Sequence, residues 1–308
     1  MKKLSLLFIS IFMGIMLYAQ QTPQLSQFMI NDFAVNPAIA GMNDYYQIKT
    51  SVRNQWVGID DAPKTTLLSI YGRSSDHVGL GGSVYNDQVG PTSRAGAALT
   101  YAYHLNISED IKLFETEFKQ ALRSEVKLVN TVANYILRNK GKHIRPVLTI
   151  LSARVCGEPS LNSYKSAAMI ELLHIATLIH DDVVDESKLR RGKPTANNLW
   201  GNKSSILVGD YLFSKSFQIM VNDADFLVMK TIANASQSLA KGEVMQLSLT
   251  NNLDSTKEKY LKVIEGKTAG LFSAAAVLGG IITKQKQDTI NHLSLFGNYL
   301  GIAFQILD

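Results

Sequence analysis

Three aspartates crowd one turn of a predicted helix in the middle of the chain: Asp181, Asp182 and Asp185. Helical residues four apart share a face, so Asp181 and Asp185 can reach one cation, while Asp182 lies about 100° around the axis. Mg²⁺ suits such acids because it takes one or two carboxylates and keeps its other positions for water and phosphates. Since Arg190 and Arg191 follow shortly after, the run predicts a metal and phosphate site.

A basic turn precedes the acids and predicts a second phosphate contact. Lys142 and Arg145 flank the start of a helix whose first position is Pro146. Backbone N–H groups at a helix start and two cationic side chains could hold a phosphate together. The acidic run and the basic turn would each, alone, also fit a solvated helix end, and Lys267-Thr268 alone would fit a helix start. Because all three occur in order along one predicted bundle, we favour a single shared site.

His174 lies two helical turns before Asp181 on the same stripe. A histidine there is either a packed core residue or a ligand of the site, and its alignment with the acid favours a ligand. From residue 107 onward, apolar residues recur at a spacing of three to four, which predicts an all-α bundle. Such bundles host metal sites on facing helices. The predicted helices cover 113–138, 147–155, 163–185, 204–221, 226–250, 255–265, 269–283 and 289–307.

Composition limits the alternatives. The chain has 308 residues, 46% apolar content and a net charge of +5, enough for real cores but without the basic and aromatic blocks of a nucleic-acid surface. We therefore expect no nucleic-acid partner. Cys156 is the only cysteine, which excludes an internal disulfide, and its apolar surroundings predict packing rather than nucleophilic chemistry.

The first third of the chain has a different character, with no glutamate before Glu109. Residues 1–20 have the basic start and apolar core of a signal peptide. Segments 46–56, 65–73, 78–86 and 95–104 alternate in period two between turn residues, which predicts antiparallel hairpins. In the last segment the two faces are Ala97, Leu99, Tyr101 and Tyr103 against Ala98, Thr100, Ala102 and His104. That pattern suits either a barrel wall with a lipid side or an ordinary soluble sheet.

Several phrases of this first third resemble the type IX secretion system membrane protein family PorP/SprF. They are Gln27-Phe28-Met29-Ile30-Asn31, Asn36-Pro37-Ala38-Ile39-Ala40-Gly41, Gln55-Trp56-Val57-Gly58 and the run from Tyr85 to Thr92. The resemblance covers about 1–108 and implies an incomplete, outer-membrane-barrel-like β segment over 21–108 that associates with the outer membrane.

Residues 109–308 resemble the trans-isoprenyl diphosphate synthases, in particular the long-chain polyprenyl synthases. The matching motifs are Gly141-Lys142-His143-Ile144-Arg145-Pro146, Glu171-Leu172-Leu173-His174, His180-Asp181-Asp182-Val183-Val184-Asp185, Arg190-Arg191-Gly192, Val208-Gly209-Asp210-Tyr211-Leu212, Gly242-Glu243, Lys267-Thr268-Ala269 and Phe304-Gln305 with Asp308. The resemblance implies an isoprenoid-synthase-type bundle, usually a homodimer. It would condense isopentenyl diphosphate head to tail with an allylic diphosphate, using Mg²⁺.

The resemblance also implies roles for single residues. It assigns the metal to Asp181, Asp182, Asp185 and Asp308, the allylic diphosphate to Arg190, Lys267, Thr268 and Gln305, and isopentenyl diphosphate to Lys142, Arg145, His174 and Arg191. Mg²⁺, Lys and Arg would stabilise negative charge on the departing pyrophosphate. That pyrophosphate would accept the lost proton, so no protein base is needed. A terpene cyclase or head-to-head synthase also uses an Asp-rich motif, but the basic turn and the Phe304-Gln305 ending favour chain elongation.

Residues one turn before the acids, Ala176 and Thr177, lie where the family's growing tail would run, and Leu173 lies one turn further. Short-chain members of the family carry an aromatic residue here. We therefore expect a medium or long all-trans product, of C30 to C40.

Two features point to a composite chain. The family's second Asp-rich motif stops at Asp308, so we expect 109–308 to be truncated and weakly active. A signal peptide directs a chain outward, whereas prenyl transfer is cytoplasmic. Two hypotheses follow: a prenyltransferase behind a foreign leader, or a type IX secretion component with a foreign helical tail. We expect a chimera.

Overall fold

The computed structural model describes residues 31–138, 141–222, 225–249 and 256–307. The chain forms two compact units, one up to Asn106 and one from Ile107 onward, and each is described by itself. In the described ranges, no helix combines the length and the apolar character needed to span a membrane. The predicted signal peptide lies outside the described residues.

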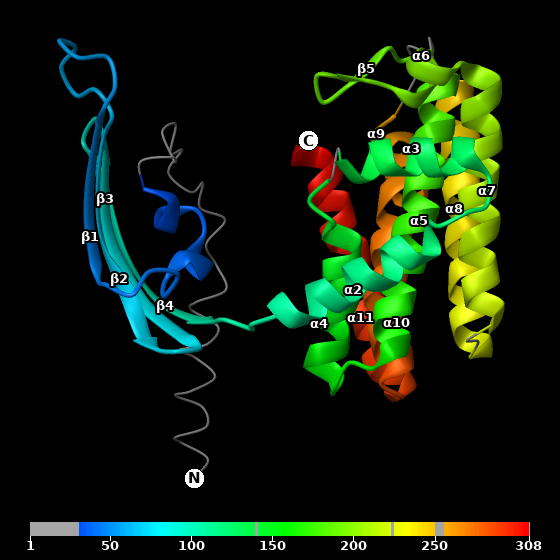
Figure 1. Ribbon diagram of the computed structural model, residues 1–308. Helices are drawn as coiled ribbons and strands as arrows, with labels where there is room; N and C mark the ends of the chain where they lie inside the picture. Colours follow the sequence, from blue (N-terminus) through cyan, green and yellow to red (C-terminus); the bar gives the residue numbers. More distant parts are fainter. Residues whose placement is uncertain (1–30, 139–140, 223–224, 250–255, 308) are drawn as a thin grey trace. The chain divides into compact units, whose positions relative to one another are not determined.

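The first unit is a four-stranded antiparallel sheet with strands in sequence order (Figure 1). The strands follow two short 3-10 turns, η1 (Asp32–Ala34) and η2 (Pro37–Ile39). They are β1 (Gln47–Asn54), β2 (Lys64–Ser75), β3 (Val78–Val89) and β4 (Thr92–Tyr103). All four match the predicted alternating segments to within a few residues, so the hairpin prediction is confirmed.

The two faces of this sheet differ as the alternation predicts. One face exposes apolar side chains, with Leu99 96% exposed beside Tyr101 and Tyr103 on β4. The opposite face is partly covered by the 3-10 turns, where Phe33 stacks on Tyr71 with ring centroids 4.2 Å apart. The sheet therefore has its apolar face outward.

The second unit is an all-α bundle, as predicted. Its long helices are α2 (Ser108–Ala121), α3 (Lys127–Arg138), α4 (Ile144–Cys156), α5 (Leu161–Val184), α7 (Asn202–Asn222), α8 (Phe226–Leu249), α10 (Gly270–Ile282) and α11 (Gln287–Leu307). Shorter elements are β5 (Leu189–Arg190), β6 (Lys193–Pro194), α6 (Ala196–Trp200), α9 (Lys257–Ile264) and a π turn, η3 (Glu265–Ala269). The sequence did not predict the β5–β6 hairpin.

The predicted helix over 113–138 is wrong as a single element, because the chain breaks between α2 and α3. The amide of Ser124 donates to the side-chain oxygen of Asn130, and the side-chain amide of Asn130 donates back to the Ser124 carbonyl. Side-chain bonds of this kind compete with the helical ladder. The bonds between Ser124 and Asn130 therefore separate α3 from α2, and the apolar residues of α3 pack on the bundle.

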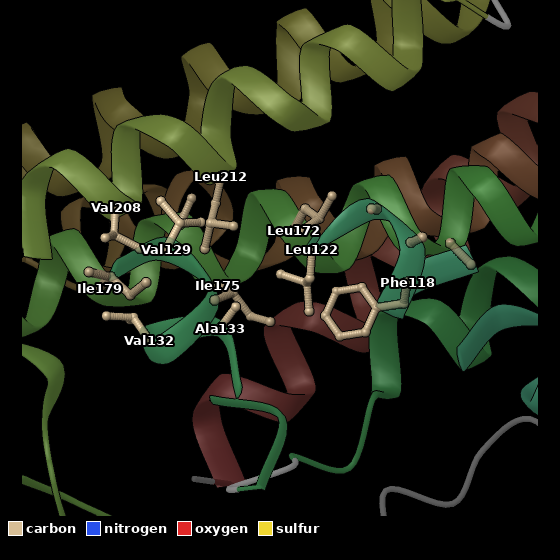
Figure 2. Packing of buried hydrophobic residues seen from close by; sticks show 14 of the residues in the cluster. Phe118, Leu122, Val129, Val132, Ala133, Leu172, Ile175, Ile179, Val208 and Leu212 are labelled. Atoms are coloured by element: carbon tan, nitrogen blue, oxygen red, sulfur yellow. The ribbon is translucent and has the colours of Figure 1, made fainter. Parts of the chain in front are cut away.

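The buried helix α5 separates two apolar clusters. One cluster joins α2, α3, α5 and α7 and includes Leu172, Ile175 and Leu212 (Figure 2). The other joins α4, α5, α8 and α10 and includes Leu173 and Phe272. Because α5 is packed on both faces, the position of its C-terminal end, which carries the aspartates, is fixed within the bundle.

The end of α5 lies at the same end of this unit as the β5–β6 hairpin, α9 and the last turn of α11 (Figure 1). Gly279 of α10 lets α4 approach closely, since a Cβ there would lie 2.5 Å from the backbone nitrogen of Ala153. Side-chain contacts of His143 with Glu171 and of Arg145 with His174 place the start of α4 beside α5.

Candidate active site

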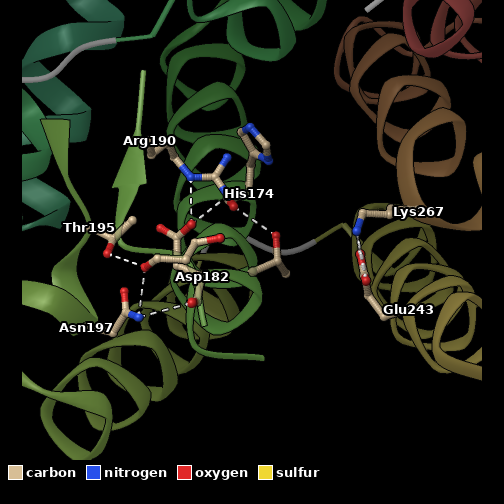
Figure 3. Close-up of polar contacts among 9 residues, drawn as sticks. His174, Asp182, Arg190, Thr195, Asn197, Glu243 and Lys267 are labelled. Carbon is tan, nitrogen blue, oxygen red and sulfur yellow. Dashed lines mark hydrogen bonds and ion pairs between the residues drawn. The ribbon is translucent and has the colours of Figure 1, made fainter. Parts of the chain in front are cut away.

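The acidic run lies where α5 ends, as the helical reading predicts. Asp181 and Asp182 belong to the last turn, and Asp185 caps the helix. The buried Asp182 carboxylate, 6% exposed, accepts from Nε of Arg190 at 2.9 Å, and Arg190 NH2 lies 2.8 Å away. The side chain of Asn197 donates to the backbone carbonyl of Asp182 (Figure 3). Asp182 thus connects the helix end to the hairpin.

Asp181 has a different environment. Burial raises its pKa to about 6, and the negative charges of Glu243 and Asp185 act in the same direction, against Lys267 and Arg190. Acidic groups outweigh basic ones around this carboxyl. A divalent cation would relieve that imbalance, so the donor set fits Mg²⁺, an oxygen-seeking ion.

Glu243 is a site residue for which the sequence assigned no role. Its carboxylate bonds to Nζ of Lys267 at 2.9 Å, as a pair separate from Asp182 and Arg190 (Figure 3). The helices carrying them touch at two glycines, since a Cβ on Gly242 would lie 2.5 Å from the backbone nitrogen of Lys267. Gly242 was the available local signal, since a residue without a Cβ allows another backbone to approach closely, but it does not identify Lys267 as the partner of Glu243.

The predicted metal ligands do not all converge. Within the described residues, no three His, Cys, Asp or Glu side chains gather as a metal-binding group. Of these acids, Asp182 is bonded to Arg190 in this structure. Asp308 lies outside the described residues.

A cavity of about 640 Å³ lies beside α5, and the β5–β6 hairpin contributes its cationic side chains. Its wall includes His174 and Asp182 from α5, Arg190 and Arg191 from the hairpin, and Gly141 from the basic turn. A cationic cavity of this size can take a diphosphate.

Arg145 and His174 contact each other directly. NH1 of Arg145 lies 2.9 Å from Nε2 of His174, and the guanidinium lies over the Phe272 ring, 4.7 Å from its centroid. A guanidinium can only donate, so Nε2 accepts and the proton of the neutral ring is on Nδ1. Burial, with the charges of Arg145, Arg190 and Arg191, holds the pKa of His174 well below its usual value. Burial lowers the pKa of Arg145 to about 10.

The hairpin presents Arg191 in a constrained turn. Arg191 and Gly192 have φ of 52° and 73°, as a two-residue turn with both central residues left-handed requires. The Tyr135 hydroxyl donates to the Pro194 carbonyl at 2.6 Å. A Cβ on Gly141 would lie 3.1 Å from NH1 of Arg191. The basic turn and the hairpin are therefore adjacent, and Lys142 is exposed beside them.

The remaining predicted residues fall into two groups. On the allylic side, the Thr268 hydroxyl donates to Oε1 of Gln305 at 2.6 Å. On α5, Thr177 is partly exposed, whereas Ala176 and Leu173 are fully buried in opposite clusters.

Comparison with known proteins agrees with this geometry. The profile of the polyprenyl synthetase family matches residues 126–308, more than half of the chain, and the profile described as type IX secretion system membrane protein PorP/SprF matches residues 17–114. The chain is 42% identical over 201 residues to an octaprenyl diphosphate synthase of Escherichia coli, covering 65% of this chain and 62% of that protein. It is 39% identical over 203 residues to an all-trans-nonaprenyl-diphosphate synthase of Rhodobacter capsulatus, covering 66% and 62%.

Solved structures give the same result. A decaprenyl diphosphate synthase from Rhodobacter capsulatus is similar with a TM-score of 0.63 and 48% identity, over 66% of this chain and 62% of that one. A polyprenyl synthase from Caulobacter crescentus, complexed with calcium and isoprenyl diphosphate, has a TM-score of 0.63 and 37% identity, over 65% and 61%. The chain thus spans about 62% of the length of these relatives. It belongs to the polyprenyl synthetase family.

Proposed function

We propose that the helical unit is a prenyltransferase that condenses isopentenyl diphosphate head to tail with an allylic diphosphate. One observation carries the proposal: a cavity with Arg190, Arg191 and His174 on its wall lies beside the acid-rich environment of Asp181. A diphosphate needs the first feature and its accompanying cation needs the second.

The cationic side chains form two groups, one near Asp181 and one near His174, and we assign one substrate to each group. Lys267 and Arg190 would bind the allylic diphosphate near Asp181, with Thr268 and Gln305 on that side. The other cations, Lys142, Arg145 and Arg191, would bind isopentenyl diphosphate with His174, whose Nδ1–H can donate to a phosphate oxygen.

The reaction follows from these positions. Cationic side chains stabilise the charge that builds on the departing pyrophosphate as the allylic carbon–oxygen bond breaks. Bound Mg²⁺ would supply further Lewis-acid stabilisation at Asp181 and Asp185. The apolar part of the cavity wall, with Ile175, Leu178 and Ile179, would keep water from the carbocation while the isopentenyl double bond attacks it. That attack leaves a new carbocation, and the released pyrophosphate accepts the proton that this cation loses as it becomes the allylic product.

The test is incorporation of labelled isopentenyl diphosphate by the purified 308-residue chain with farnesyl diphosphate and Mg²⁺. We expect products that chromatography resolves as C30 to C40, and loss of incorporation with a chelator. The matched control is Asp181→Asn. Incorporation no higher than that of this control would contradict the proposal; slow incorporation above it would agree with the weak activity expected from the sequence.

We also propose that the enzyme is a homodimer. Apolar side chains on α7 and α8, Leu207, Val244 and Leu247, are exposed in the single chain, and a second copy could cover them. A molar mass from light scattering that is twice that of the monomer would support the homodimer. A monomer mass at micromolar protein concentration would contradict it.

A second function is favoured by the outward apolar face of the sheet. We infer that residues 47–103 form a lipid-facing wall of the PorP/SprF kind, so that the chain reaches the outer membrane rather than staying with cytoplasmic substrates. Leu99→Asp on the exposed face should reduce co-flotation with phospholipid vesicles, while Thr100→Asp on the opposite face should not. Equal flotation of the two variants would contradict this inference.

A further inference from the structure

We propose that Glu171 and His143 form a positioning pair for the isopentenyl diphosphate site. Glu171 fixes the His143 ring, and the ring fixes the turn that carries Gly141 and Lys142. The inference deepens the proposed function and rests on it.

The pair is buried and well aligned. Nδ1 of His143 lies 2.8 Å from Oε1 of Glu171, and the two side chains are only 15% and 8% exposed. The His143 ring also packs edge-on against Phe114 and Phe118, with centroids 5.5 and 6.1 Å away. The ring is therefore held on one side by a carboxylate from α5 and on the other by two aromatic rings from α2.

The backbone of His143 has the conformation that needs such support. Its φ of 46° is left-handed at the residue that precedes α4. A residue that has a Cβ rarely adopts this left-handed backbone conformation unless contacts with other parts of the protein hold it there. The buried contacts of the ring supply them, so the turn keeps its direction although Lys142 is exposed.

The direction of this turn matters because of what lies beside it. Gly141 approaches NH1 of Arg191 so closely that a Cβ would lie 3.1 Å from it. Gly141, His143 and Glu171 all line the cationic cavity with Arg191 and His174. A shift of the turn would separate Gly141 from Arg191, change the position of Lys142, and weaken the binding of isopentenyl diphosphate alone.

Glu171 has a second effect through charge. Its negative charge opposes the burial that lowers the pKa of Arg145, so it favours the charged guanidinium that bonds to His174. The carboxylate thus supports both halves of the phosphate site, the turn and Arg145, from one buried position.

The test compares Glu171→Ala with Glu171→Gln in the full chain. Glu171→Ala removes the acceptor and should raise KM for isopentenyl diphosphate about tenfold, with kcat and the KM for the allylic substrate changed less than about threefold. Glu171→Gln keeps an oxygen that accepts from Nδ1–H and should restore KM to within about threefold of the original. His143→Asn keeps a residue that tolerates the left-handed turn but loses the ring contacts, and should resemble Glu171→Ala.

The matched control is Asp110→Asn, which weakens another buried carboxylate pair, with Arg154, away from the cavity. It should reduce stability without a selective change in KM. Equal KM shifts in Asp110→Asn and Glu171→Ala would overturn the proposal, as would an unchanged KM in both Glu171→Ala and His143→Asn. If Glu171→Ala does not fold, His143→Asn decides.

Binding of inorganic pyrophosphate, measured by calorimetry, separates this inference from the proposed function. Weaker binding in Glu171→Ala and normal binding in Asp110→Asn support the pair even if the unsubstituted chain transfers no prenyl group. Pyrophosphate affinity that is equal in all three proteins would contradict the pair whatever the activity.

Discussion

Arg190 and Asp182 form an ion pair across the end of α5, with Nε and NH2 of Arg190 lying 2.9 and 2.8 Å from the same carboxylate oxygen. Among the described residues, the neighbouring Asp181 has no such partner, and burial with nearby acids raises its pKa to about 6. The two adjacent carboxylates therefore differ, because that of Asp182 is paired with a cation and that of Asp181 lies near other acids. Asp182 anchors the hairpin that carries Arg190 and Arg191, while Asp181 gains most from an added cation.

The first prediction concerns this anchor. Arg190→Gln leaves the buried Asp182 charge without its cation and should lower the free energy of unfolding by about 2 kcal/mol, less than for a fully buried pair because Arg190 is 43% exposed. Asp182→Asn in the same chain should recover at least half of that loss, and neither variant should turn over normally. Urea unfolding gives the double-mutant cycle, and losses that simply add would contradict the pairing.

The second prediction concerns Asp181→Asn without metal. The raised pKa means that ionised Asp181 costs stability, so the substitution should stabilise the protein by about 1–2 kcal/mol at pH 7.5, allowing for solvent screening. The stability that protonated Asp181 contributes is lost as the pH rises through about 6. The difference between the two proteins should therefore vanish near pH 4.

Added Mg²⁺ should reverse the order at pH 7.5. The unsubstituted chain should gain thermal stability with millimolar Mg²⁺, whereas Asp181→Asn should gain little, and turnover of the variant should fall about 10²–10³-fold. Calorimetric melting with and without a chelator measures this. Equal Mg²⁺ stabilisation of both proteins would show that the cation binds elsewhere.

The helical bundle and the acidic turn were predictable because they depend on local patterns. Three-to-four apolar spacing is enough to define α5, and the (i, i+4) relation places Asp181 and Asp185 on one side. The break after α2 was not predictable in this way, because the bonds between Ser124 and Asn130 compete with an otherwise continuous apolar pattern.

Contacts between distant segments were harder still to predict. Nothing near Glu243 in the sequence reveals that it bonds to Lys267, which requires the glycine contact between α8 and η3. Likewise, the ion pair of Asp182 depends on how the hairpin folds back over α5. Local patterns gave the residue types of the site, whereas packing determined which acid is paired.

The third prediction concerns Thr177 and Ala176, which sequence analysis placed together on the path of the growing tail. Thr177 is partly exposed and lies four positions before Asp181, on the stripe that the growing tail would follow. Thr177→Phe should shorten the product by several isoprene units, which reversed-phase chromatography resolves. Ala176 is fully buried in the cluster that joins α5 to α2, α3 and α7, so Ala176→Phe should instead destabilise the bundle by about 1–3 kcal/mol. Unchanged product length in Thr177→Phe would contradict this path of the tail.

The last prediction concerns the network that joins α2, α4 and α5 near the start of α5, at the opposite end of that helix from the acidic turn. Asp110, almost completely buried, accepts from Nε and NH2 of Arg154 at 3.0 and 3.1 Å and from the Tyr164 hydroxyl at 2.7 Å. Burial alone would raise the pKa of Asp110, but these bonds outweigh it and the pKa is lowered. A lowered pKa contributes stability above the unfolded value of 3.8, and that stability is lost as the pH falls below it. Asp110→Asn should therefore cost about 2–3 kcal/mol at pH 7 and progressively less below pH 4. Chemical denaturation across this range measures the difference, and a constant gap would mean that the carboxylate charge does not stabilise the three helices.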